Sequence, residues 1–324
     1  MKNVIIFSVC MLCASVNLLA QPQQKFTIQN GTKMVFYDDL ETAVQQAASG
    51  DTIYLPGGLF QLQSELIINK KLAIFGTGWD TGTMGGISIT QIQNDIRFAE
   101  GSSGSLLTGC NISGNINFES NLQNITILRN RISGNINFTS GKQMVVSENW
   151  VASSIGIYGD TSDECQINNN YSRSIINFSN SRIYNNVTEF ATNLYGCTVE
   201  NNFIMNESDA DISSCSNCYF NNNAFEGNIT FPVGTNIGNN NLMDQSMADT
   251  FNGTEQPKDL EIQDSSPCKN AGTDGTDIGI YGGINPWKPD ELPFNPHIIQ
   301  VVIPTQADKD GNLKVNISVA AQTR

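Results

Sequence analysis

The chain has 324 residues, of which 39% are hydrophobic, and its 31 acidic and 17 basic side chains give a formal net charge of -14. This charge excludes a nucleic-acid-binding protein, which needs a basic surface to displace counterions, and the apolar content excludes a disordered chain. Charged residues make up only 15% of the chain, whereas Asn alone accounts for 40 residues, and so many Asn and Gly disfavour a helical fold.

The first 20 residues have the pattern of an export signal. Lys2 supplies a positive start, an apolar run extends over residues 4–19, and the small residue Ala20 ends it. The run is too short to favour a membrane-spanning helix, and no later segment is apolar enough to span a membrane. Lipid attachment at Cys10 or Cys13 is the disfavoured alternative, because neither follows a suitable sequence. We therefore expect an exported protein, in the periplasm, on the outer surface or outside the cell.

A short amphipathic helix is expected over about residues 38–48. Its apolar residues Leu40, Ala43, Val44 and Ala47 follow helical spacing. A strand that begins with Gly-Asp-Thr-Ile follows directly. A helix at this place would cap the first of the repeats described next.

Residues 52–242 contain an internal repeat, which predicts about nine or ten coils of a solenoid. The sequence of residues 112–118 recurs at residues 132–138, and Tyr158 and Phe178 continue its aromatic column. One Asn returns in every repeat with a mean spacing of about 18 residues. These residues are Asn130, Asn149, Asn170, Asn186, Asn202, Asn223 and Asn240.

The positions around the recurring Asn predict which side of each coil is buried. The residue three before it is always apolar and is Ile237 in the last repeat, and the residue five before it is apolar or small. Two such positions form one inward face of a short strand, so the fold predicted is an all-β parallel solenoid. The Asn itself fits a turn with left-handed backbone, where its amide can bond the Asn of the next coil and form a ladder.

Six Cys follow the signal, namely Cys110, Cys165, Cys197, Cys215, Cys218 and Cys268. An even number in an exported protein is typical of disulfides. However, Cys165, Cys197 and Cys218 share one inward column, which favours a stack of buried thiols. Cys197 and Cys218 would lie on adjacent coils, within reach of a disulfide, so the pairing of the six stays open.

Two further segments follow the coils. A closing segment, residues 266–283, contains Ser-Pro-Cys-Lys-Asn-Ala-Gly and Asp-Ile-Gly-Ile-Tyr-Gly-Gly. A tail, residues 284–324, is expected to hold a hairpin of two strands over residues 298–303 and 313–319.

The helix followed by Gly-Asp-Thr-Ile, the Gly-x-Gly at residues 76–78 and the closing segment resemble right-handed parallel β-helix proteins of the pectin-lyase-like superfamily, of the kind secreted by Bacteroidetes-type bacteria. The resemblance covers about residues 37–324. It implies a right-handed single-stranded parallel β-helix domain over residues 21–283, with an N-terminal capping helix and a C-terminal β-hairpin tail. It implies little about activity, because this superfamily includes lyases, hydrolases, epimerases and adhesins.

The catalytic motifs of that superfamily are not matched. Its pectin hydrolases carry Asn-Thr-Asp, Asp-Asp and Gly-His in the central coils, whereas the only Asp-Asp here is Asp38-Asp39 and the only His is His297 in the tail. Its pectate lyases use Asp-bound calcium and an Arg or Lys base. The candidate bases would be Arg129, Arg131, Arg173 and Arg182, whose alternative role is that of solvated surface residues.

Acidic residues gather in the two central 21-residue repeats. They are Asp160, Asp163 and Glu164 in one repeat, and Glu207, Asp209 and Asp211 in the other. Two 16-residue repeats lie between them, so the long coils could form the walls of a shallow saddle that binds calcium or a cation-bridged glycan. The alternative is that these acids only supply solubility.

Aromatic and Arg side chains are the other candidates for ligand binding. Trp150 and Tyr171 occupy the same position on adjacent coils and are expected to stack, and with Arg173 and Arg182 they could bind a glycan. Packing within the protein is the alternative role for the aromatic rings.

The missing motifs favour a non-catalytic exported or cell-surface protein that binds glycans or partner proteins along the solenoid. The second hypothesis is a polysaccharide lyase or another carbohydrate-active enzyme whose site is not recognised.

Overall fold

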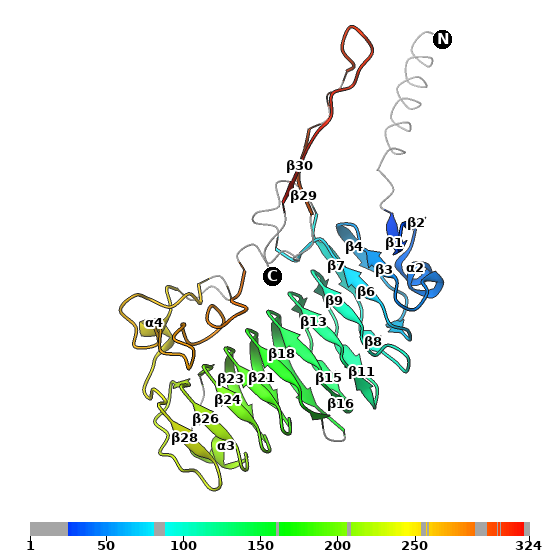
Figure 1. Ribbon diagram of the computed structural model, residues 1–324. Coiled ribbons are helices and arrows are strands. Elements are labelled where there is room, and N and C mark those ends of the chain that lie inside the picture. The colour runs from blue at the N-terminus through cyan, green and yellow to red at the C-terminus, as the bar shows by residue number, and fades with distance from the viewer. Residues whose placement is uncertain are drawn as a thin grey trace, which may run out of the picture.

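The computed structural model describes residues 25–80, 88–159, 162–205, 209–253, 257, 259–288, 297–302, 304 and 306–320. The predicted fold class is confirmed, because the chain forms a parallel β-solenoid of about nine turns. The coils stack into a rod, and the chain passes from one end of the rod to the other between β3 and β28 (Figure 1). The predicted signal segment lies outside the described residues.

One strand of each coil belongs to a 12-stranded sheet, sheet A, which is parallel except for the first two strands in the chain. In spatial order its strands are β2 (Lys33–Tyr37), β1 (Phe26–Asn30), β3 (Thr52–Tyr54), β6 (Ala73–Phe75), β9 (Leu106–Thr108), β13 (Thr126–Leu128), β17 (Val145–Ser147), β20 (Gln166–Asn168), β22 (Arg182–Tyr184), β24 (Thr198–Glu200), β26 (Tyr219–Asn221) and β28 (Ile237–Asn239).

A 13-stranded sheet, sheet B, forms the opposite wall of the coils, and a small three-stranded sheet, sheet C, closes one corner. The main path of sheet B is β27 (Ala224–Phe225), β25 (Phe203–Ile204), β23 (Val187–Thr192), β21 (Tyr171–Ile176), β18 (Trp150–Ile157), β14 (Arg131–Ile132), β10 (Asn111–Ile112), β7 (Thr90–Gln93) and β4 (Gly58–Gln61), with β5 (Leu66–Ile68), β8 (Ile96–Phe98), β11 (Ile116–Phe118) and β15 (Ile136–Phe138) beside it. Sheet C consists of β12 (Leu122–Gln123), β16 (Gly141–Lys142) and β19 (Ser162–Asp163).

The central residues of the sheet A strands form the inward column that the repeat predicted. From Ile53 to Phe220 they lie in register, and every one is apolar and buried. The last repeat is shifted by one residue from the prediction, because Phe220 pairs with Gly238, and Ile237 is 46% exposed. A Cβ on Gly238 would lie 2.3 Å from the ring of Phe231, which packs against Phe220 and covers the end of the core.

A second column of aromatic rings fills the core beside sheet B. Phe118 stacks on Phe98 at 5.0 Å and on Phe138 at 4.5 Å between ring centroids. The prediction that Tyr158 continues this column is wrong. The coil is one residue shorter here, so Phe138 pairs with Ile157 and Tyr158 is 57% exposed.

The first coil is covered by the predicted helix, α2 (Leu40–Gln46), whose Leu40, Ala43 and Val44 are buried. Asp39 caps the helix, since its carboxylate accepts a 2.7 Å hydrogen bond from the backbone N–H of Thr42. The hairpin of β1 and β2, which the sequence did not predict, extends sheet A beyond the first coil.

The recurring Asn form a buried ladder along the turn between sheets A and B. In each step the Nδ2 and the backbone N–H of one Asn both donate to the Oδ1 of the Asn on the next coil, at 2.9–3.2 Å for Asn130 and Asn149. The ladder continues through Asn170, Asn186, Asn202 and Asn223. Its last member is Asn241 and not the predicted Asn240, in agreement with the one-residue shift of the last coil.

The left-handed backbone predicted for the ladder Asn belongs to the residue before it. Gly109, Arg129, Glu148, Asn169, Asn185, Asn201, Asn222 and Asn240 all have positive φ angles. We call these eight residues the outer column and the ladder Asn the inner column. The two columns run side by side along the turn and differ in what they bind, as described below.

The described residues of the segment 246–288 run back along the outside of sheet B instead of ending at the last coil (Figure 1). Helix α4 (Met247–Thr250) begins this segment, and Phe251, Leu260 and Ile278 pack with Val187 and Phe203 in a second hydrophobic cluster. The predicted closing segment is therefore part of a strap along the rod. We call residues 266–288 the strap.

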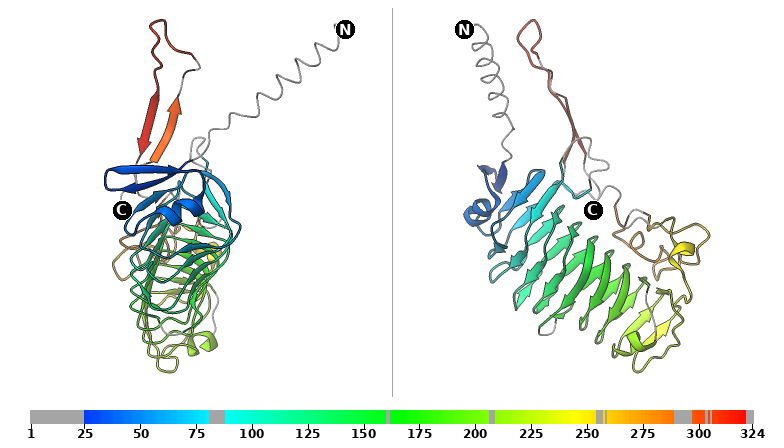
Figure 2. Two further views of the ribbon diagram at one scale, coloured as in Figure 1. Left: turned by 90° about the vertical axis from the view of Figure 1, so that its right-hand side faces the viewer. Right: turned by 180° about the vertical axis from the view of Figure 1, so that it is seen from behind.

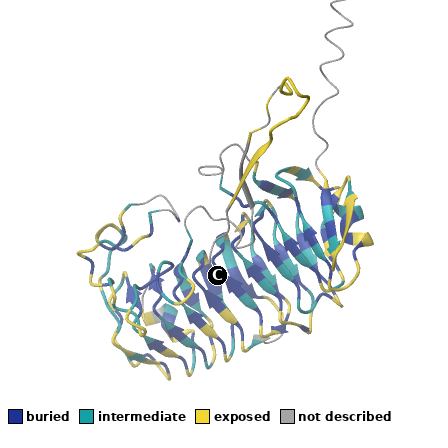
Figure 3. Cartoon of the chain, turned by 45° about the horizontal axis from the view of Figure 1, so that its top comes forward, coloured by how far each residue is buried: buried dark blue, intermediate teal, exposed yellow. Residues whose placement is uncertain are grey.

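The hairpin expected in the tail is present as β29 (His297–Val302) and β30 (Asn316–Ala320), which pair only with each other among the described strands. It projects from the solenoid (Figure 2), and β30 is exposed over the residues whose burial is described (Figure 3). The six Cys among the described residues are all free and buried. In the part of the chain that the structure describes, no helix has both the length and the apolar character needed to cross a bilayer.

Candidate functional site

Four Asn of the outer column hold the strap against the rod. Each lies on a successive coil, and its side-chain amide bonds a strap residue, mostly a backbone carbonyl. The pairs are Asn222 with Ala271, Asn201 with Thr273, Asn185 with Asp277 and Gly279, and Asn169 with Ile280 and Gly282. An Asn side chain on a left-handed turn thus binds the strap once per coil.

The outer column changes character at Arg129 and Glu148, which face each other on adjacent coils. Arg129 Nε donates to Glu148 Oε2 at 2.8 Å, and the two side chains are 4% and 5% exposed. Both residues have left-handed backbone, with φ of 52° and 54°, a conformation that favours Gly or Asn over other residues. Strain of this kind is retained where the surrounding structure enforces it, and it marks candidate functional positions.

Burial raises the pKa of the Glu148 carboxyl above its ordinary value, and the nearby positive charges of Arg129 and Lys288 lower it in part. A buried ion pair loses hydration on both partners, and it is stable only with good geometry. Lys288 is the last residue of the strap, so the end of the strap places a positive charge near Glu148.

A cavity of about 330 Å³ lies against this ion pair, over the outer face of sheet A. Its floor is aliphatic and comes from three successive coils, and its rim is polar. Leu106, Leu128 and Val145 form the floor, and Asn124, Thr126, Ser147, Arg129, Glu148 and Asn285 supply polar groups. Asn285 belongs to the strap, so the cavity lies at the place where the strap meets the interruption of the outer column.

The structure brings Trp150 and Tyr171 together as expected. They pair in register on adjacent coils, with ring centroids 6.3 Å apart and an angle of 20° between the rings. The other face of Trp150 is covered by the guanidinium of Arg131, whose Cζ lies 4.6 Å from the ring centroid. Both faces of Trp150 are therefore used inside the protein, and both rings pack against the cluster under the strap.

Arg173 and Arg182 do not join these rings. Arg173 lies in sheet B, where its Nε is 3.5 Å from a carboxylate oxygen of Glu189. Arg182 lies in sheet A, pairs with Glu200 at 3.0 Å, and stacks over the ring of Tyr184. Of the four predicted ligand-binding residues, Trp150, Tyr171 and Arg173 thus lie in sheet B, whereas Arg182 lies on a different wall of the rod.

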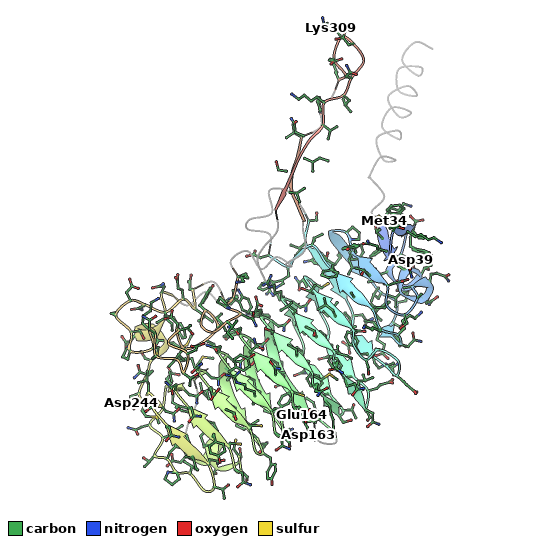
Figure 4. All side chains as sticks on the ribbon, in the orientation of Figure 1. Met34, Asp39, Asp163, Glu164, Asp244 and Lys309 are labelled. Atoms are coloured by element: carbon green, nitrogen blue, oxygen red, sulfur yellow. The ribbon has the colours of Figure 1, made fainter. Side chains whose placement is uncertain are left out.

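The predicted acidic saddle is not assembled by its described members. Asp163 and Glu164 lie at the corner of sheet C (Figure 4), where Glu164 accepts a 3.0 Å hydrogen bond from Gln143. Asp209 and Asp211 lie in α3 (Asp209–Ser213), three coils further along the rod.

Three coil spacings amount to about 14 Å, which is too far for both acidic groups to bind one cation. Asp160 and Glu207 lie outside the described residues. Among the residues that are described, no three His, Cys, Asp or Glu side chains are grouped closely enough to hold a metal ion.

Comparison with known proteins adds no assignment, since neither a protein-family model nor a curated protein sequence matches the chain. The candidate site therefore rests on its geometry. Sequence reasoning singled out Arg129 only as one of four Arg and did not select Glu148. A signal was present, because Arg129 and Glu148 occupy the place where five of the seven repeats have Asn in register.

Proposed function

We propose that the protein is an exported or cell-surface β-solenoid without catalytic activity, which binds a glycan at the cavity beside Arg129 and Glu148. The observation that carries the proposal is this cavity, whose volume is about 330 Å³. It lies where the described outer column has a buried ion pair in place of the Asn or Gly found at its other positions. Its volume is at the lower end of the range for small-molecule sites.

The chemistry of the lining suits a sugar ring. The aliphatic floor of Leu106, Leu128 and Val145 can take the C–H face of a sugar, while Asn124 and Asn285 offer amide donors and acceptors to its hydroxyls. The positive charge of Arg129 is already matched by Glu148, so an uncharged sugar fits better than an acidic one at this position.

Two further parts of the proposal rest on the sequence. The motifs of the helix, the first strand and the closing segment resemble right-handed β-helix proteins of the pectin-lyase-like superfamily, and the solenoid with its capping helix is consistent with that assignment. The signal pattern of residues 1–20 supports export. Binding of partner proteins along the rod is the alternative mode of action within the same class.

A pair of variants at equivalent positions of two sheet A strands, β13 and β24, tests the site. Thr126 lines the cavity, and Thr198 occupies the same column four coils away. We expect calorimetry against a panel of neutral oligosaccharides to find a ligand that Thr126→Trp binds at least tenfold more weakly and Thr198→Trp binds like the wild type. Equal affinities of the two variants, or no ligand in the panel, would contradict the proposal.

One observation favours a second function, cleavage of a polysaccharide. The raised pKa of Glu148 would suit a carboxyl that donates a proton in a cavity. Against this, glycoside hydrolysis ordinarily needs two carboxylates, and Glu148 is the only carboxylate among the described residues that line the cavity. Release of new reducing ends or of unsaturated sugars by wild-type protein, and not by Glu148→Gln, would establish the enzyme instead.

A further inference from the structure

Arg131 lies on the other side of Asn130 from the cavity, and indole rings hold its side chain in place. Its Cζ is 4.6 Å from the ring centroid of Trp150 and 6.0 Å from that of Trp79. The rings are themselves fixed, since Tyr171 stacks on Trp150 and Trp287 packs edge-on against Trp79. Cation–π contacts of this kind orient a guanidinium through its face and leave the N–H groups at its edge available for other partners.

Arg131 differs from the other Arg of the described residues in having no carboxylate partner. Each of the other four pairs with at least one Glu, although acids outnumber bases in the chain. The pairs are Arg97 with Glu65 and Glu119, Arg129 with Glu148, Arg173 with Glu189, and Arg182 with Glu200. An exposed, oriented guanidinium with no acidic partner among the described residues therefore stands out in a protein of net charge -14.

Arg131 forms one side of a groove of about 260 Å³ on the outer face of sheet B, and no described residue of the strap lines this groove. Hydrogen-bond donors from three successive coils converge on the groove, namely the amides of Gln91 and Asn111 and the hydroxyls of Ser113 and Ser133. Within the described part of the chain, these four side chains form no hydrogen bond with protein, and no carboxylate lines the groove.

We propose that this groove binds a tetrahedral oxyanion, a sulfate or phosphate ester group carried by a glycan. Such a group presents three terminal oxygens to donors on several sides. The fork of Arg131 can bind two of them, and Gln91, Asn111 and the two Ser remain for the rest. A carboxylate has only two oxygens and would leave part of this donor set unused. The inference of an oxyanion site is drawn from the geometry of the groove alone. Only the inference that a glycan carries the oxyanion rests on the proposed function.

The three Trp of the chain give a direct measurement, because two contact Arg131 and the third packs against one of these. We expect the intrinsic fluorescence of the wild-type protein to change saturably with a sulfated oligosaccharide or with a sugar phosphate. The desulfated oligosaccharide should bind at least tenfold more weakly. The relative affinity for the two esters identifies the anion, and sodium chloride at matched ionic strength controls for screening.

Variants separate this site from its neighbours. Arg131→Gln should weaken binding of the esterified ligand at least tenfold, and Arg131→Lys should weaken it to a lesser extent because Lys retains the charge without the fork. Lys142→Gln removes an equal charge from an exposed position in sheet C and should bind like the wild type. Far-ultraviolet circular dichroism of each variant checks that it is folded.

Two outcomes at the groove itself would overturn the inference, and a third, in Thr126→Trp, is given below. One is equal binding of the sulfated and desulfated ligands by the wild type, and the other is undiminished binding of both esters by folded Arg131→Gln. Thr126→Trp, which blocks only the cavity of the proposed function, should leave ester binding in the groove unchanged. Loss of binding in Thr126→Trp alone would therefore locate the ligand in the cavity and contradict the groove, so the two proposals fail in distinguishable ways.

Discussion

Asn169 and Asn170 are neighbours of the same type, both buried, yet they serve two different parts of the molecule. Asn170, in the inner column, bonds only solenoid residues, and its amide joins the Asn of the preceding and following coils. Asn169, in the outer column, has φ of 53° and donates to the carbonyls of Ile280 and Gly282 in the strap, 111 and 113 residues away.

The difference between the two columns follows from backbone geometry. The left-handed residue directs its side chain out of the turn, and the next residue directs its side chain into the stack, so one step along the chain exchanges the partners. Asn suits both places, because it tolerates left-handed backbone and its amide both donates and accepts. A repeated Asn-Asn pair can therefore encode two separate functions, one that joins coils and one that binds an extended segment.

The largest effect should come from the inner column. Asn170→Ala removes the amide that accepts from Asn149 and donates to Asn186 and to two backbone carbonyls, and it leaves these buried groups without partners. We expect the free energy of unfolding to fall by about 4 kcal/mol, since each unsatisfied buried group costs about 1–3 kcal/mol. Urea denaturation followed by circular dichroism measures the change, and a loss below about 1 kcal/mol would show that the ladder contributes little.

A smaller and local effect is expected from the outer column. Asn169→Gly keeps the left-handed backbone and removes the two hydrogen bonds to the strap, together with the one that Asn169 Oδ1 accepts from Asn168, which should cost about 2 kcal/mol. Amide hydrogen exchange should accelerate in the strap and stay unchanged in the β20 and β22 strands. Asn169→Ala is the matched variant, which should cost about 1 kcal/mol more because Ala is strained at positive φ. Uniform acceleration throughout the solenoid would mean that the columns are not independent.

The smallest expected effect is a pH dependence of stability, which Glu148 causes in the coils where the outer column is charged. A carboxyl whose pKa rises on folding favours the folded state while it is protonated, and this contribution is lost as the pH rises through the raised pKa. For Glu148 the loss begins near the ordinary Glu value of about 4.3. Relative to Glu148→Gln, wild-type protein should therefore become less stable as the pH rises from that value.

Urea denaturation between pH 4 and pH 8 tests this dependence. Glu189→Gln, at an exposed position, controls for the general effect of surface charge. A stability difference between wild type and Glu148→Gln that is constant with pH would show that Arg129 fully compensates the burial of Glu148. A difference that changes in the opposite direction would show that it more than compensates.

The sequence predicts the parts of the fold that repeat. The spacing of one Asn and two apolar positions is enough for the solenoid, the inward column as far as Phe220 and the ladder as far as Asn223. Prediction from the repeat fails where a residue outside the repeat pattern changes the register of a coil. Phe231 fills the place of one core residue and shifts the last coil, so Ile237 and Asn240 were placed one position too early.

The candidate site was less predictable, because it depends on contacts between distant segments. The position of the strap on the outer column brings Asn285 and Lys288 to Arg129 and Glu148, and no local pattern encodes that approach. Trp150 and Tyr171 were placed correctly as a stacked pair, but the cover of Arg131 on the other face of Trp150 depends on the register of β14 with β18.

The strap also changes which part of the solenoid bears a mechanical load applied through the tail. Its last residue, Lys288, lies near Glu148 in the middle of the solenoid, so the strap ends there and not at the final coil. Tension applied through the tail would be taken up first by the strap, one Asn contact after another from Asn169 toward Asn222, before it reached the coils at the end of the rod. We therefore expect the terminal coils to be shielded from mechanical load by a segment that forms no part of the coil repeat.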